Sequence, residues 1–252
     1  MNNQMTKYSA DEILQILIDF YNFQSQYDPE VDEGEELTFD STIADWRMIC
    51  DLLEHKELAK YHHDLFKLQT PIAELEKILI LEKQNKLRDF CVYIAENALK
   101  ENIAPVISMG QTCMTSAIFK TLVSNLKHRG INTDNIKPSS EFILLFDKYG
   151  SELLEEVNKL APGSLTKFEY RDNKIVRIGW SIIGIFILSI IVIPVIWHFH
   201  WGLMILLGLG LIAIIVGKRF EPEKNIIGGY ATVRDLITGI QTQINKTSTH
   251  NS

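Results

Sequence analysis

The sequence predicts an all-α protein: a cytosolic helical bundle of about five to six helices, then a two-helix transmembrane hairpin and a short C-terminal amphipathic helix. Three observations predict this class. Apolar residues recur at helical spacing through most of residues 10–160. Two nearly continuous apolar runs follow, and neither contains Asp, Glu, Lys or Arg. A weaker helical stripe then precedes a polar tail.

The two apolar runs cover residues 178–197 and 201–217. A bilayer core about 30 Å thick needs roughly 20 apolar residues in a helix, and the first run meets that length. The second run is shorter, but Lys218 can snorkel to the interface at its end. Pro194 disfavours one long continuous span. We therefore expect a transmembrane hairpin that reverses over the segment HFHWG.

Basic residues flank this predicted hairpin on both sides and are missing from its turn. They are Lys167, Arg171, Lys174 and Arg177 before it, and Lys218, Arg219 and Lys224 after it. Positively charged flanks stay on the cytosolic side of a membrane. The pattern therefore predicts a multi-pass protein of the cell (inner) membrane with both termini in the cytosol.

Two sets of candidate site residues lie in the predicted hairpin. Residues expected at the membrane interface are Trp180, Trp197, His198, His200 and Trp201. Small residues that could allow close helix–helix contact are Gly208, Gly210, Ala213 and Gly217. The two histidines could also hold a divalent metal or sense pH, but two ligands are too few unless protomers pair. The simpler interpretation is that they cap the turn, and we expect no metal or cofactor.

Composition restricts the partners. The chain has 252 residues, 46% apolar content and a net charge of −7, concentrated in its first half. Nucleic acid requires a basic patch, so we expect no nucleic-acid partner. The three cysteines are too far apart for a disulfide framework or a zinc motif. The first residues lack the apolar segment of a signal peptide.

The chain divides into four predicted parts. Residues 1–163 form an acidic cytosolic helical domain, and residues 164–177 form either a polar linker or a small β-hairpin. Residues 178–217 are the transmembrane hairpin. Residues 218–252 contain an amphipathic helix, which could lie on the bilayer or dock on the domain, and a tail.

Local signals place the helices of the first part. Ser9 and Glu12 match a capping box that opens a helix to about Phe23. A Thr-Pro pair is a helix start signal at residues 70–71. The remaining expected helices run from about 41 to 66 with a break near His55, from 72 to 100 with a bend at 82–88, from 112 to 128 ahead of a Gly130 cap, and from about 140 to 160.

Chemistry-bearing patterns are weak in this sequence. Cys113 lies at a predicted helix N-terminus, a position that lowers the pKa of a thiol and can make a nucleophile. The preceding MGQT resembles cysteine peptidases only in a nearby Gln, without their aromatic signature. Neighbouring His62 and His63 point about 100° apart on a helix and cannot share one metal. No phosphate loop, GxSxG or paired-carboxylate motif is present in the sequence, so we expect no catalytic residues.

The predicted function is therefore a membrane-anchored, non-enzymatic interaction or scaffold protein. Its expected partners are the lipid bilayer and a protein partner or a second copy of the chain. The alternative is a multimeric membrane-acting effector or transporter accessory subunit, because the spans are rich in glycine. A third hypothesis is a cysteine-dependent enzyme that uses Cys113.

Overall fold

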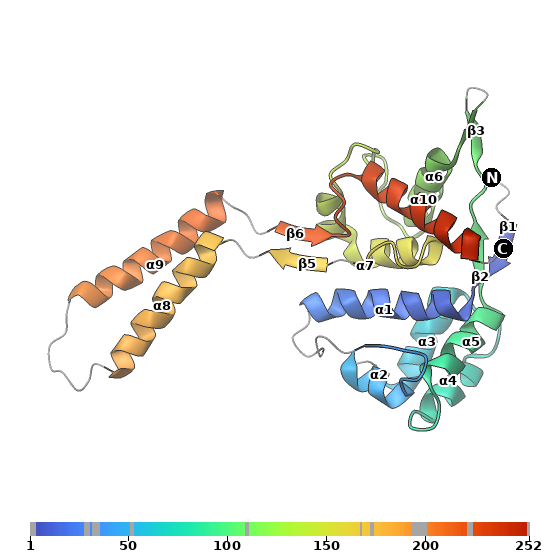
Figure 1. Cartoon of the computed structure of the whole chain (residues 1–252), viewed down its shortest axis with the longest axis horizontal. Coiled ribbons are helices and arrows are strands. Elements are labelled where there is room, and N and C mark those ends of the chain that lie inside the picture. The colour runs from blue at the N-terminus through green and yellow to red at the C-terminus, as the bar shows by residue number, and fades with distance from the viewer. Residues whose placement is uncertain are drawn as a thin grey trace. The chain divides into compact units, whose positions relative to one another are not determined.

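The computed structural model describes residues 4–27, 31, 36–50, 53–108, 111–166, 168–171, 174–192, 201–220 and 224–250. The chain forms two compact units: unit 1 contains residues 1–168 and 227–252, and unit 2 contains residues 169–226 (Figure 1). The described helices are α1 (Ala10–Tyr27), α2 (Ile43–Ile49), α3 (His55–Phe66), α4 (Ile72–Ile80), α5 (Leu87–Asn97), α6 (Met114–His128), α7 (Phe142–Leu160), α8 (Lys174–Val192), α9 (Trp201–Phe220) and α10 (Val233–His250). The described strands are β1 (Gln4–Lys7), β2 (Leu99–Asn102), β3 (Val106–Ser108), β4 (Gln111–Cys113), β5 (Phe168–Arg171) and β6 (Lys224–Ile227).

Helix α1 is the central element of unit 1. The predicted capping box is confirmed: Ser9 N donates to Glu12 Oε2 at 2.9 Å, and Glu12 N donates to Ser9 Oγ at 3.2 Å. One face of α1, with Ile13 and Leu17, joins the apolar core formed with α2 to α5. Phe23, further along the helix, packs on the second core, which α6, α7 and α10 form. Because α1 contributes to both cores, it holds the two halves of unit 1 together (Figure 1).

The C-terminal helix α10 belongs to unit 1 although the whole of unit 2 separates it from α7 in the sequence. Backbone bonds join the starts of the two helices: Phe142 N donates to the Ala231 carbonyl, and Val233 N to the Ser140 carbonyl, both at 3.0 Å. The apolar face of α10 is buried, and Leu236 is 0% exposed. This amphipathic helix therefore docks on the domain, one of the two alternatives open from the sequence.

Two short antiparallel ladders complete unit 1. Strand β1 pairs with β2, with Met5 opposite Glu101, and β3 pairs with β4. Neither ladder was predicted, because strands this short show no alternation strong enough to compete with the neighbouring helical stripes.

Unit 2 consists of β5, β6 and the α8–α9 hairpin. Strands β5 and β6 form a two-stranded sheet, and α8 and α9 lie side by side (Figure 1). Glycines allow the two helices to approach closely. A Cβ atom on Gly179 would lie 2.9 Å from the Gly210 carbonyl oxygen, and one on Gly217 would lie 2.9 Å from Val176 Cγ2.

The structure contradicts the predicted transmembrane hairpin over residues 178–217. Within the described residues, no helix is both long and apolar enough to cross a bilayer. Helix α8 begins at Lys174 and includes Arg177, so its uninterrupted apolar part, 178–192, is shorter than the roughly 20 residues needed. In α9 the uninterrupted apolar part, 201–217, is also shorter than that, and Lys218 and Arg219 lie in the last turn of the helix. Residues 193–200 lie outside the described part.

Two further predictions depended on that hairpin. The location in the inner membrane, with two spans and both termini in the cytosol, was predicted from the charges beside the two spans. Because no described helix can cross a bilayer, this prediction is wrong. The membrane part of the predicted fold class is also wrong, whereas the mostly helical architecture is confirmed.

Candidate functional site

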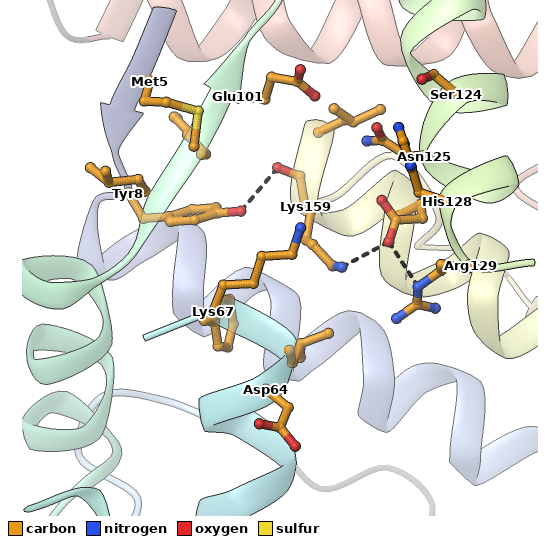
Figure 2. Close-up of a pocket in the computed structure, with 16 residues that line it drawn as sticks. Met5, Tyr8, Asp64, Lys67, Glu101, Ser124, Asn125, His128, Arg129 and Lys159 are labelled. Atoms are coloured by element: carbon orange, nitrogen blue, oxygen red, sulfur yellow. Dashed lines mark hydrogen bonds and ion pairs between the residues drawn. The ribbon is translucent and has the colours of Figure 1, made fainter. Parts of the chain in front are cut away.

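A polar cavity of about 540 Å³ lies in unit 1 and is lined by residues from five elements or their ends (Figure 2). Its walls come from β1, the C-terminal end of α3, β2, the end of α6 and the last turns of α7. It contains several charged side chains, including Lys67, Lys100, Arg129, Glu156 and Lys159.

Glu156 is the centre of the charge network in this cavity. The residue is 5% exposed, and Oε1 contacts Arg129 Nε at 3.1 Å and Lys159 Nζ at 2.8 Å (Figure 2). Arg129 also pairs with Glu155 through a second nitrogen. The Tyr8 hydroxyl donates to the Lys159 carbonyl at 3.3 Å, and burial raises the pKa of this tyrosine. This network ties the end of α6 to α7.

Lys67 has two unusual features. It has a positive φ of 52°, because it ends α3 in the left-handed conformation, with Leu68 N donating to the His63 carbonyl at 3.0 Å. Its side chain points into the cavity in Figure 2 and has no ion pair with any described residue. The helix cap explains the positive φ of this residue.

Cys113 takes the position that the sequence predicted. It is the N-cap residue of α6 and is partly exposed. A hydrogen bond with the Thr115 hydroxyl at 3.3 Å, followed by the backbone N–H of Ser116, lowers the pKa of this thiol. The groups that contact the thiol are hydroxyl and amide groups, which are not general bases at neutral pH. The cysteine-dependent enzyme stays a prediction.

The histidines of α3 have separate environments. His55 Nε2 contacts Glu82 at 3.0 Å, His63 Nε2 contacts the Thr70 carbonyl at 2.8 Å, and His62 is buried among aromatic rings. Among the described residues, no three His, Cys, Asp or Glu side chains could together hold a metal ion.

The residues predicted at a membrane interface are only partly described. Trp180 lies on α8 and is 61% exposed, and Trp201 is the first residue of α9. Trp197, His198 and His200 lie outside the described residues.

The structure brings some of the predicted small residues into the α8–α9 contact. A Cβ atom on Gly210 would lie 2.8 Å from Ile183 Cγ1, and Gly217 faces Val176. Gly208 has open space around it, and Ala213 is half-buried. Contact between separate copies through these residues stays a prediction.

Large apolar side chains cover the outside of the α8–α9 hairpin. Ten of them have between 39% and 67% of their surface exposed: Ile178, Trp180, Ile185, Ile187, Ile205, Leu209, Leu211, Ile212, Ile215 and Val216. Folded proteins rarely expose so many large apolar side chains on two neighbouring helices without a partner to cover them. The apolar residues of this surface are evident in the sequence, although they indicated helices that cross a membrane, whereas the residues of the polar cavity share no local sequence pattern.

No protein-family model, curated protein or solved structure matches this chain. What the protein does must therefore be inferred from the chemistry of its own residues.

Proposed function

We propose that this protein is a non-enzymatic interaction protein that docks on a lipid surface through the α8–α9 hairpin, with unit 1 as the domain held there. The exposed apolar surface of the hairpin is the observation that carries the proposal. If lipid covered these ten half-exposed side chains, their burial would contribute on the order of 10 kcal/mol to the free energy of binding.

The distribution of charge supports lipid over a protein partner. Exposed Lys174, Arg177, Lys218 and Arg219 lie at the end of the hairpin where Gly217 meets Val176. The apolar side chains extend from that end along both helices. Cations next to an apolar surface suit anionic headgroups above acyl chains.

Docking of this kind requires apolar side chains to enter only the outer part of a bilayer, roughly 5–10 Å deep. It does not require a helix that crosses the bilayer.

Flotation with liposomes tests the proposal. The full-length protein, with vesicles of phosphatidylcholine alone or with phosphatidylglycerol added, should rise with both and more completely with the anionic mixture. Replacing Ile205, Ile212 and Ile215 by serine should reduce the floating fraction about tenfold or more, because it removes three of the most exposed apolar groups.

A matched control replaces by serine three apolar residues of unit 1 that are on average more exposed, Met48, Ile107 and Leu144. This variant should float like the original protein. If the original protein stays at the bottom of the gradient with both vesicle types, the lipid proposal is wrong. The original protein could instead form multimers in the absence of lipid, and the hairpin variant could be a monomer. That result would identify a second copy of the chain, and not lipid, as the partner of the hairpin.

A further inference from the structure

The turn that follows α7 is held between two helices that lie far from it in the sequence. Gly163 N donates to Asp19 Oδ2 of α1 at 2.7 Å, and Gln243 Nε2 of α10 donates to the Pro162 carbonyl at 2.9 Å. Gly163 has a positive φ of 82°, and a Cβ atom on it would lie 3.0 Å from Gln243 Nε2. The turn is therefore packed tightly against both helices, and its backbone suits glycine.

Both chain connections to unit 2 meet at this turn. The chain leaves unit 1 a few residues after the turn and returns just before Gly228. A Cβ atom on Gly228 would lie 3.2 Å from Leu165 Cδ2, and the Tyr230 hydroxyl donates to the Ser164 carbonyl at 3.0 Å. The returning connection thus packs on the outgoing one within unit 1, so that a movement of the turn would loosen both.

Asp19 is a buried acid without a cation. It is 0% exposed, its second oxygen accepts a bond from Gln15 Nε2 at 2.9 Å, and no described Lys or Arg side chain pairs with it. An ionised carboxylate is costly in such a place, and burial raises the pKa of Asp19 to about 7. The Gln15 amide can donate to the ionised form or, when rotated, accept from the protonated form.

Other titratable groups around the turn do not act as a counter-ion for Asp19. They come from α1, the last two turns of α7, and the cavity beside Gly163, and they are Glu12, Glu155, Glu156, Lys159, Tyr230, Asp235 and Lys246. Glu12 is paired with Lys100, and Lys159 with Glu156. The pKa of Asp19 is set by burial and by its two hydrogen bonds, without a contribution from these charges.

We propose that Asp19 and Gly163 form a pH-sensitive latch in unit 1, which is closed while Asp19 is protonated and opens locally when Asp19 ionises. Opening lets water reach the carboxylate and frees the turn, together with both connections to unit 2. Because protonation favours the closed turn, opening becomes more frequent as the pH rises from about 4 to about 7, and it levels off above that. The latch is independent of lipid docking, since its residues all belong to unit 1.

Hydrogen exchange of the Gly163 amide in the full-length protein tests the latch, because this amide is the donor to Asp19. After correction for the intrinsic effect of pH on exchange, the opening constant should be about 10- to 100-fold larger at pH 8 than at pH 5. A low concentration of urea should leave it unchanged, because a local opening exposes little surface. Equal opening at both pH values, or an acceleration by urea as strong as that of the Ile94 amide in α5, would overturn the proposal.

Three variants identify the group that operates the latch. Asp19→Asn cannot ionise, so its opening constant should differ by less than about twofold between the two pH values. Asp235→Asn is the matched control and should keep the original difference. Asp235 lines the cavity beside Gly163, but it is exposed, and a hydrogen bond with Thr232 lowers the pKa of its carboxyl.

Gly163→Ala tests the latch by a route that leaves Asp19 in place. Alanine is strained at a φ of 82° and lacks space beside Gln243, so the turn should be open at both pH values. The Ser164 amide, which donates to the Ala161 carbonyl at 3.2 Å, should then exchange quickly and with little pH dependence. The original pH dependence in Asp19→Asn or in Gly163→Ala would show that another group controls the turn.

Discussion

Asp19 on α1 shows how burial changes a single side chain. It is 0% exposed, and its carboxyl oxygens accept bonds from Gln15 Nε2 at 2.9 Å and from the backbone N–H of Gly163 at 2.7 Å. Burial raises the pKa of Asp19 to about 7, although both hydrogen bonds act to lower it. The turn after α7 is therefore held to α1 by a carboxyl group that titrates near neutral pH.

This shift makes stability depend on pH in a defined direction. The folded pKa is higher than the unfolded value, so the contribution of Asp19 is complete below about pH 4 and is lost as the pH rises to about 7. The free energy of unfolding of the original protein minus that of Asp19→Asn should fall by about 2–3 kcal/mol from pH 5 to pH 8. Urea unfolding at the two pH values measures it.

The free energy of unfolding must be compared between the original protein and Asp19→Asn, because His62 changes stability with pH in the opposite direction. Its folded pKa of about 3 is lower than the unfolded value, so its contribution is lost as the pH falls below about 6.5. A difference that stays constant between pH 5 and pH 8 would show that Asp19 ionises normally.

Residue partners close in sequence were predictable, whereas distant ones were not. The Ser9–Glu12 capping box and the positive φ of 84° at Gly130 follow from local residue patterns. Arg47 Nη1 contacts Glu82 Oε2, 35 residues away, at 2.6 Å. No pattern within one helix contains that information.

At the scale of elements, non-local backbone bonds decided where helices end. A single helix over 72–100 was expected, but the chain leaves helical geometry between α4 and α5. There Ile43 N donates to the Asn85 carbonyl at 3.1 Å, and Leu87 N donates to the Ser41 carbonyl at 2.9 Å. The predicted bend at 82–88 marked the correct position. The polar cavity depends on similar long-range contacts, so its residues could not be grouped from the sequence.

Close packing of α8 on α9 gives a prediction at this scale. Gly179→Ala should loosen the hairpin, because its Cβ would lie 2.6 Å from Ile214 Cγ1 and 2.9 Å from the Gly210 carbonyl oxygen, and backbone cannot move easily. Hydrogen exchange of the α8 and α9 amides should become at least about tenfold faster.

Gly208→Ala is the matched control, since an added Cβ there meets nothing within 4 Å. Its amides should exchange at the original rate or more slowly, because alanine favours helix. Equal effects of both substitutions would mean that α8 and α9 do not pack as described.

At the scale of the whole molecule, the apolar composition of residues 178–217 did not predict how this segment is built. The apolar runs indicated two crossing helices, but the described helices begin or end with basic residues, and their apolar parts are too short. What remains is an apolar hairpin joined to a helical domain through β5 and β6. Its exposed side chains, and not its length, support the proposed lipid contact.

Quenching of Trp180 fluorescence by brominated lipid tests that contact most directly. Trp46, Trp197 and Trp201 are replaced by phenylalanine, so that Trp180, 61% exposed on α8, is the single reporter. Lipid docking predicts quenching by lipids brominated on their acyl chains, together with protection from iodide in the aqueous phase. Trp180 fluorescence that brominated lipids leave unchanged, and that iodide quenches equally with and without vesicles, would contradict it.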